Sequence, residues 1–266
     1  MRIGVRTRPG HEAADAAAAE AVGAFGVLIE PGPATGAVAA AGAATTTTVT
    51  RLVVRTVLGV DHPVTLAEDL AVLDNICAGR VVALIDTGDL DVDAAAEDLE
   101  LLVACLTPRP VQHRGARWQV PAGIEGHEAP ERIEVTPKPV QVELPVWLDG
   151  AVAAELGART GYPVVVSEPG EADDTRPVQP GVAALSGDRD ADRDMVTAWR
   201  EAGATHLLVG ATDLDAALPE IGRYLIPEVA MPLFPRVVAE AMTPRPWTGP
   251  ARYVDPPSGT DPEVAP

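Results

Sequence analysis

Aromatic and basic side chains are scarce in this chain of 266 residues. Aromatic residues make up 3% of the sequence, and 20 lysines and arginines stand against 39 aspartates and glutamates, for a formal net charge of −19. Nucleic acids and anionic membrane surfaces are bound through clustered basic residues, and single-stranded bases stack on aromatic side chains. The composition therefore predicts a protein that binds neither nucleic acid nor a membrane surface.

Cysteine is also rare, and no long apolar run is present. Cys77 and Cys105 lie far apart in apolar helical stretches and form no C-x-x-C pair, and the five histidines show no metal-binding spacing. We therefore expect buried free thiols and no metal site. No stretch approaches the length of an uncharged membrane span, and the first residues alternate like a strand, without an apolar signal-peptide core. These features predict a cytoplasmic protein.

Short β-branched runs alternate with helix-like segments along most of the chain. The runs expected to form parallel strands are residues 2–5, 26–29, 52–58, 81–85, 145–148, 163–167, 181–185 and 205–209. Apolar residues recur at helical spacing in residues 13–25, 63–78, 92–106, 151–160, 190–202 and 213–225. Continuous apolar runs are typical of strands covered on both faces. Eight strand–helix units predict an α/β fold, the (β/α)8 TIM barrel with shortened loops; an open doubly wound sheet of fewer strands is the alternative.

Three segments depart from this alternation. Residues 33–48 are rich in Gly, Ala and Thr and predict only a loose helix, and residues 168–179 predict a loop because they hold prolines, glycine and four acids. Residues 110–142 predict a small β excursion between the fourth helix and the fifth strand. Within it, residues 112–120 alternate around a glycine as a hairpin does, and residues 133–135 predict another short strand.

The expected domain organisation follows from these segments. Residues 1–226 form the barrel, from which residues 110–142 project, and residues 227–266 form a C-terminal extension. Prolines and glycines dominate the extension from about residue 243 onward, so that part is expected to be disordered.

Specific residue pairs carry a resemblance to a known family. Where the third helix leads into the fourth strand, the chain holds His62-Pro63, Ala67-Glu68, Leu73-Asp74 and Gly79-Arg80. Residues 144–150 read Leu-Pro-Val-Trp-Leu-Asp-Gly and precede an Ala-rich helix closed by a glycine, and residues 199–209 lead into the last strand. With the first strand included, residues 1–226 resemble the bacterial luciferase-like family of flavin- and F420-dependent oxidoreductases.

The resemblance implies a TIM barrel whose cofactor lies at the C-terminal ends of the strands. A reduced flavin (FMN) or the deazaflavin F420 would pass a hydride to a small organic substrate, or react with oxygen. The cofactor-binding residues that the resemblance implies are Thr56, Val57, Thr87, Gly88, Asp149, Gly150 and Ala151.

The resemblance also implies catalytic roles for two acids, Asp89 and Glu30. Asp89 stands where F420-dependent members often carry a Glu that can donate a proton to the ring, and Glu30 ends the second strand. From the residues alone, the alternatives are that Asp89 is an N-cap or part of an acidic run, and that Glu30 is a solvated residue before a Pro-Gly-Pro turn.

Acids in the loops after strands four and five depart from the family pattern. These loops face the cofactor phosphate in the family, but an anion prefers backbone N–H groups and positive charge. Two functions stay open. One is an oxidoreductase that uses F420 or reduced FMN to transfer a hydride to, or monooxygenate, a small organic substrate. The other is a non-catalytic luciferase-like paralogue that binds an active enzyme. A homodimer or a heterodimer with a paralogue is the expected assembly.

The same acids lead to two expectations about cofactor affinity. We expect no tightly bound cofactor to survive purification, because acidic loops around an exposed pocket hold an anion weakly. Two like charges about 5 Å apart at an effective dielectric of about 20 repel by roughly 3 kcal/mol before solvent and salt relax them. If the fifth strand ends as in the family, Asp149 lies close to the cofactor phosphate and should weaken binding by about tenfold to thirtyfold, so Asp149→Gly should tighten binding of FMN or F420, most visibly at low salt.

Overall fold

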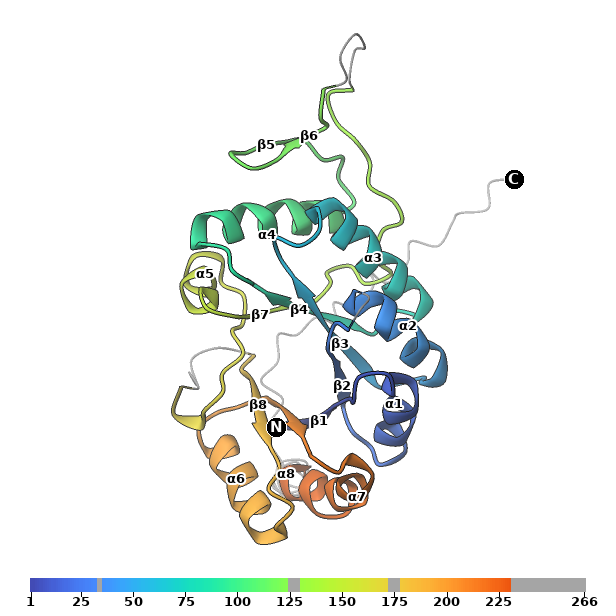
Figure 1. Cartoon of the computed structure of the whole chain (residues 1–266), viewed down its shortest axis with the longest axis vertical. Coiled ribbons are helices and arrows are strands. Elements are labelled where there is room, and N and C mark those ends of the chain that lie inside the picture. The colour runs from blue at the N-terminus through green and yellow to red at the C-terminus, as the bar shows by residue number, and fades with distance from the viewer. Residues whose placement is uncertain (33–34, 124–129, 172–177, 231–266) are drawn as a thin grey trace, which may run out of the picture. The chain divides into compact units, whose positions relative to one another are not determined.

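Parallel strands form the centre of the molecule, and helices surround them (Figure 1). The computed structural model describes residues 1–32, 35–123, 130–171 and 178–230. The strands of the main sheet are β1 (Arg2–Arg6), β2 (Gly26–Ile29), β3 (Arg51–Val57), β4 (Val81–Asp86), β7 (Val146–Asp149), β8 (Pro180–Ala184) and β9 (His206–Gly210). They pair in the order β7-β4-β3-β2-β1-β9-β8, and every pair is parallel.

The ring is closed by the run that the sequence predicts as the sixth strand, residues 163–167. This run forms single parallel bridges, Val164 with Leu148 of β7 and Val166 with Gly181 of β8. Four backbone hydrogen bonds of 2.8–3.1 Å accompany the two bridges. The predicted α/β barrel is therefore confirmed, with its sixth position held by two bridges in place of a regular strand, because Pro163 and the neighbouring loops leave room for little more.

The helices follow the strands in the order that a βα barrel requires. They are α1 (Glu12–Ala21), α2 (Gly36–Thr46), α3 (Pro63–Ile76), α4 (Val92–Leu106), α5 (Ala153–Thr160), α6 (Arg189–Glu201), α7 (Leu214–Glu220) and α8 (Ile226–Ala230). A 3₁₀ turn, η1 (Pro169–Glu171), and a π turn, η2 (Ile221–Leu225), complete the set. Asp91, Asp188 and Asp213 cap α4, α6 and α7 by accepting backbone N–H bonds. Among the described residues, none of the helices is long and apolar enough to cross a membrane.

Several boundaries differ from those expected. The segment predicted as a loose helix is the regular α2, which Thr35 caps and which packs its alanines against α1. The expected loop at 168–179 begins with η1, and its residues 172–177 lie outside the described part. The last helix continues through η2 into α8, and the rest of the expected C-terminal extension lies outside the described residues.

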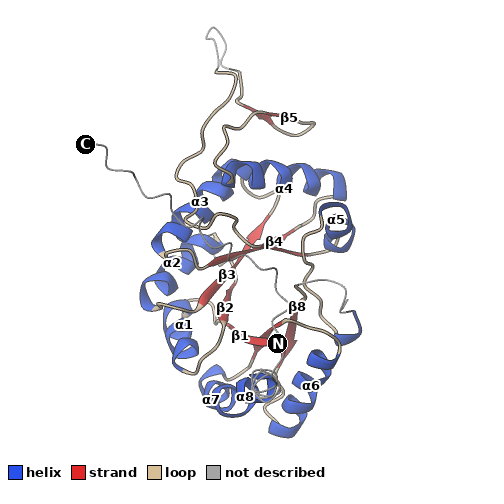
Figure 2. Cartoon of the chain, turned by 180° about the vertical axis from the view of Figure 1, so that it is seen from behind, coloured by secondary structure: helices blue, strands red, loops and turns tan. Residues whose placement is uncertain are grey.

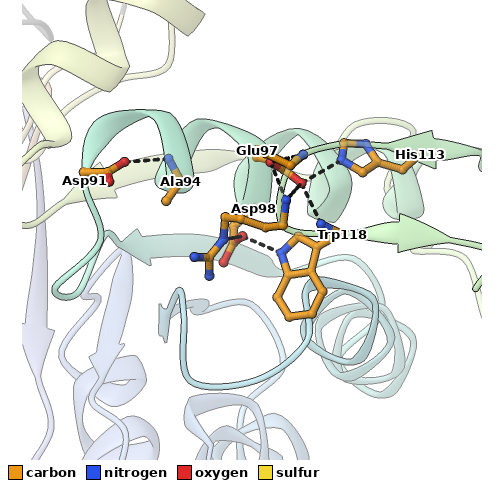
Figure 3. Close-up of polar contacts among 8 residues, drawn as sticks. Asp91, Ala94, Glu97, Asp98, His113 and Trp118 are labelled. Atoms are coloured by element: carbon orange, nitrogen blue, oxygen red, sulfur yellow. Dashed lines mark hydrogen bonds and ion pairs between the residues drawn. The ribbon is translucent and has the colours of Figure 1, made fainter.

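The excursion between α4 and β7 forms the expected hairpin. Its strands β5 (His113–Arg114) and β6 (Gln119–Val120) pair antiparallel, and Ile133 bridges Val111. Figures 1 and 2 show the hairpin beyond α4, outside the ring of helices. Glu97 of α4 accepts backbone N–H bonds from the hairpin turn, and Asp98 accepts the indole N–H of Trp118 at 2.6 Å (Figure 3).

Two apolar clusters stabilise the barrel. The larger one lies between strands and helices and includes both cysteines, which are free and buried as expected. The smaller cluster draws one or more residues from most strands: Leu28, Val53, Val82, Leu84, Trp147, Val165 and Leu208. These side chains share the inward-facing parity of their strands, so they fill the barrel interior. Burial of each large aliphatic side chain contributes about 1.5–3 kcal/mol, and this layer forms the floor beneath the site.

Candidate functional site

Charged side chains cap the apolar interior at the C-terminal ends of four neighbouring strands. Because side chains alternate along a strand, the residue two positions after an inward-facing residue also faces inward. This relation places Glu30 above Leu28, Arg55 above Val53, Asp86 above Leu84 and Asp149 above Trp147. The sequence thus changes from apolar to charged at one level of the barrel, and this level is its mouth.

Arg55 joins the three carboxylates of this layer. Its Nε lies 2.6 Å from Glu30 Oε2, its Nη1 donates to Asp86 Oδ2 at 2.7 Å, and its Nη2 lies 2.7 Å from Asp149 Oδ2. The side chain is 19% exposed. Burial alone would lower the pKa of Arg55, but the surrounding carboxylates, Glu30 first among them, raise it overall. Arg55 is therefore a permanent cation that holds three acids in place.

Because of this network, the charge of Asp149 acts differently from what the sequence argument assumed. The sequence argument treated its carboxylate as an unpaired charge that repels a phosphate, but the carboxylate is paired with Arg55. Its other oxygen accepts the N–H of Gly150 at 2.8 Å. The network still carries three carboxylates and one guanidinium, so this half of the mouth is net negative.

A cavity of about 870 Å³ opens beside the network. Leu28, Val182 and Leu208 form its apolar floor, and Glu30 and Arg55 form its boundary with the acidic half. The opposite wall comes from β1, β8, β9 and their following loops, and its polar lining residues include Arg6, Thr7, Arg8, Ser167 and Thr212. A cavity of this size, with an apolar floor and a few polar groups, suits a small organic ligand.

Thr87, Gly88 and Gly150 form a tight junction between the ends of β4 and β7. Thr87 N–H donates to the Asp149 carbonyl at 2.9 Å, and Gly88 N–H donates to Asp86 Oδ1 at 2.9 Å. Gly150 has φ +103°, and a Cβ at this position would collide with Thr87 Oγ1. Thr87 is fully buried, and its hydroxyl has no hydrogen-bond partner within the described residues.

The remaining predicted residues lie away from the mouth. Thr56 and Val57 line a separate cavity of about 260 Å³ between the loops that precede α2 and α3. Thr56 is buried and has the outward parity of β3. Asp89 and Ala151 are exposed, and the N-cap of α4 is Asp91 and not Asp89. Of the implied site residues, the structure thus brings Glu30 and Asp149 together with Arg55 and leaves Asp89 outside.

Sequence reasoning missed Arg55 and Arg6, the two arginines beside Glu30. Arg6 Nε lies 3.2 Å from Glu30 Oε1. A signal was present, because Arg55 follows the apolar run Leu52–Val54 at the same parity as Val53. Because side chains alternate between the two faces of a strand, this spacing identifies the charged residue as inward-facing near the strand end. Among the described residues, no cluster of three or more His, Cys, Asp or Glu side chains could hold a metal ion.

Solved structures share this architecture. The chain is similar to the coenzyme F420-dependent tetrahydromethanopterin reductase of Methanopyrus kandleri, with a TM-score of 0.70 and 14% identity over 85% of this chain and 98% of that one. An F420-dependent secondary alcohol dehydrogenase in complex with an F420-acetone adduct aligns with a TM-score of 0.67 and 14% identity over 86% and 98% of the two chains.

A flavin-dependent structure aligns as well. The oxygenating constituent of 3,6-diketocamphane monooxygenase from Pseudomonas putida, a type II Baeyer-Villiger monooxygenase in complex with FMN, gives a TM-score of 0.63 and 15% identity over 86% of this chain and 98% of that one. No family model matches the sequence, and no curated protein does. The chain therefore shares the βα-barrel fold of these three proteins.

Proposed function

We propose that this chain is a luciferase-like oxidoreductase that uses F420 or reduced FMN to transfer a hydride to, or monooxygenate, a small organic substrate. The observation that carries the proposal is the 870 Å³ cavity at the C-terminal mouth of the barrel, with an apolar floor and charged groups on its rim. The similarity to F420- and FMN-binding proteins of the same fold supports it.

The lining of the cavity fits a flat, largely neutral ring. Leu28, Val182 and Leu208 offer an apolar surface to such a ring, and Glu30 stands at the rim of the cavity. When bound, reduced FMN or F420 supplies the hydride, and reduced FMN also reacts with oxygen. The acidic half of the mouth would hold donor groups of the ligand and not its phosphate, because three carboxylates surround a single guanidinium there.

Glu30 is the acid that we propose to act on the substrate. Its carboxylate lines the cavity and is held by Arg55 and Arg6, which fix its orientation while leaving it 18% exposed. A carboxylate held in this way can accept or return a proton at a fixed point of the cavity. The exposed Asp89 keeps the proton-donating role that the family resemblance implies only as a weaker alternative.

The non-catalytic reading remains the second candidate, and one observation favours it. All three nitrogens of Arg55 face carboxylates of the chain itself, so this cation has no charge left for a ligand. A barrel that binds a small molecule, or an active paralogue, without passing electrons would tolerate such a closed network.

The decisive experiment combines cofactor titration with turnover. Purified protein is examined for visible absorbance, then titrated with FMN and F420 by fluorescence, and the oxidation of the reduced cofactors is followed with a panel of small carbonyl and alcohol substrates. We expect binding and cofactor oxidation, with Glu30→Gln retaining binding and losing most turnover. Glu100→Gln, an exposed change on the outer helix α4, serves as the control.

The outcomes separate the candidates. Binding without turnover in the wild type would support the non-catalytic reading, and the absence of binding to either cofactor would overturn the proposal. Turnover that is unchanged in Glu30→Gln would remove Glu30 from the catalytic step and return attention to Asp89.

A further inference from the structure

The charges around the mouth are distributed unequally between its two walls. The wall from β2, β3, β4 and β7 carries Glu30, Asp86 and Asp149 around Arg55. In the lining of the 870 Å³ cavity, the wall formed by β1, β8 and β9 contributes arginine and hydroxyl groups and no carboxylate. An anion entering this cavity is repelled by the first wall and attracted to the second.

We propose that Arg6 is the anion-binding group of the mouth and holds the phosphate or carboxylate of the bound ligand. The identity of the ligand as FMN or F420 rests on the proposed function, but the anion site itself does not. The resemblance places the phosphate near the loops after β4 and β7, and the proposed site lies across the cavity from them.

The position of Arg6 follows from the alternation along β1. Arg2, Gly4 and Arg6 share the inward parity, and Arg6 is the last of them, at the C-terminal end of the strand. Its neighbour on β9 is Gly210, and a Cβ there would lie 3.6 Å from Arg6 Cδ. Because the neighbour on β9 is a glycine, no side chain crowds Arg6 on that side, while its Nε contacts Glu30 on the other.

Arg6 differs from the other two arginines of the cavity in its unused donors. Its Nε contacts Glu30 at 3.2 Å, and within the described residues neither of its Nη groups has a partner. Arg8 is saturated, because Asp15 and Asp215 accept bonds from all three of its nitrogens. Arg55 is surrounded by three carboxylates. The Arg6 side chain is 59% exposed, so its free edge is accessible.

The geometry of the guanidinium defines the class of ligand. Its planar edge presents parallel N–H donors that match two oxygens of a carboxylate or phosphate. The hydroxyls of Ser167 and Thr212 line the same wall and can donate further hydrogen bonds. The loops after the seventh and eighth strands of βα barrels are frequent phosphate sites, and residues 185 and 210–212 line this cavity. The proposed ligand is thus a small organic anion.

FMN and riboflavin provide a matched pair of probes, because they differ only by the phosphate. We expect wild-type protein to bind FMN at least about tenfold more tightly than riboflavin. In Arg6→Gln the two affinities should become equal through a loss for FMN, with riboflavin unchanged. Arg2→Gln removes the same charge from the same face of β1 at the opposite end of the barrel, and should keep the wild-type ratio.

Inorganic phosphate tests the site without a flavin. At constant ionic strength, replacing chloride by phosphate should raise the Tm of the wild type and of Arg2→Gln, and leave that of Arg6→Gln unchanged. Arg6→Lys keeps the positive charge but lacks the parallel N–H donors of the guanidinium, so its Tm should rise less than that of the wild type. Circular dichroism checks that each variant is folded, which is expected because Glu30 keeps its contact with Arg55.

Each outcome bears on one proposal. An FMN-to-riboflavin ratio, or a phosphate response, that survives in Arg6→Gln overturns the assignment of Arg6. A phosphate response that depends on Arg6, in a protein that binds neither FMN nor F420, supports the anion site and overturns the proposed function.

Discussion

Arg55 determines the charge of the barrel mouth because it is shared by acids from three strands. Without it, Glu30, Asp86 and Asp149 would face one another around the strand ends with little to offset their repulsion. Removing one partner from a largely buried charged network costs more than the network contributes as a whole, because the remaining charges stay desolvated. The stability of the fold should therefore depend on Arg55.

Arg55→Met should destabilise the protein by about 3 kcal/mol at neutral pH. Urea denaturation at pH 7 measures this loss. Arg51→Met, on the same face of β3, removes hydrogen bonds to Gly79 and Gln141 but no carboxylate contact, so its cost should be smaller. Equal losses in the two variants would contradict the network.

Position 150 requires glycine both because its backbone is left-handed and because a Cβ would collide with its neighbours. Comparison with a second glycine separates these two effects. Gly161 also has a left-handed φ, +80°, but a Cβ there would meet no atom within 4 Å. Gly161→Ala should therefore cost about 1–2 kcal/mol from backbone strain alone. Gly150→Ala should cost at least about 1 kcal/mol more, because its Cβ would collide with Thr87 Oγ1 and lie 2.8 Å from Asp86 Oδ1. Equal losses of unfolding free energy in the two variants would show that the junction between β4 and β7 shifts to accommodate the added methyl group.

His206 should make the stability depend on pH. Burial, followed by the charges of Arg2 and the N-terminal amine, lowers the pKa of His206 from 6.5 to about 4. Its ring lies 4.7 Å from that of Phe25 and 5.3 Å from that of Trp147. Because the unfolded chain takes up the proton first, stability should fall as the pH drops from about 6.5 to 4 and lose no more to this group below that range.

The contribution of His206 can be isolated by comparison with His206→Gln. Unfolding of the wild type in this pH window should absorb about one proton more than unfolding of the variant. Parallel pH dependences of the two unfolding free energies would show that His206 is not the group responsible.

For individual residues, the sequence predicted which side chains stand at the strand ends better than it predicted the contacts between them. The attention given to strand ends singled out Glu30 and Asp149, which the structure pairs with Arg55. The pairing with Arg55 depends on the stagger of neighbouring strands, which fixes which ends lie level with each other, and one sequence does not specify that stagger.

At the level of elements, the residues that carry the family resemblance serve the fold. His62 Nδ1 accepts the N–H of Val64 and caps α3. Asp74 is fully buried and accepts hydrogen bonds from Val81 and Gln141, which fixes the start of β4. Arg80 donates to carbonyls at the end of α2. These contacts explain why the resemblance predicts the barrel well.

Glu97 of α4 holds the turn of the hairpin β5–β6, beside the contacts that Asp98 makes with Arg117 and Trp118. Glu97 accepts N–H bonds of 2.8–2.9 Å from Ala116, Arg117 and Trp118. Burial raises the pKa of Glu97, but these bonds, that of Trp118 first, lower it overall. Glu97→Gln should speed amide exchange at residues 116–118 by about tenfold or more, because an amide offers one acceptor in place of two. Glu100→Gln on the exposed face of α4 should have no effect; unchanged exchange in Glu97→Gln would contradict this anchoring.

Element boundaries were predictable only where a cap or breaker marks them. Pro63 marks the start of α3 and Asp91 caps α4 in the structure, whereas α2 was underestimated because its Ala, Gly and Thr composition has little amphipathic pattern. Its stability comes from packing against α1, α3 and β3, which the isolated segment does not reveal.

For the whole molecule, counting the strand–helix units was sufficient to favour a barrel over an open sheet. The closure could not be read from residues 163–167 alone, because an apolar run of this length predicts a strand whether or not it pairs fully on both sides. The structure shows a strong ladder on one side of the ring, where β3 and β4 pair through six residues, and a weak one on the other.

Because the pairing is weak at the sixth position, the barrel wall has one weakly bonded line there, which we call the seam. The two arcs of the wall are joined at residues 163–167 by four backbone bonds, involving the amides of Leu148, Val165, Val166 and Val182. Transient opening should therefore begin there, and these four amides should exchange well before those of β3 and β4. If the barrel wall opens along the seam, a ligand can enter from the side as well as through the mouth. The cavity wall that carries Arg6 borders this line through β8, so anion binding and the rate of opening at the seam should be coupled.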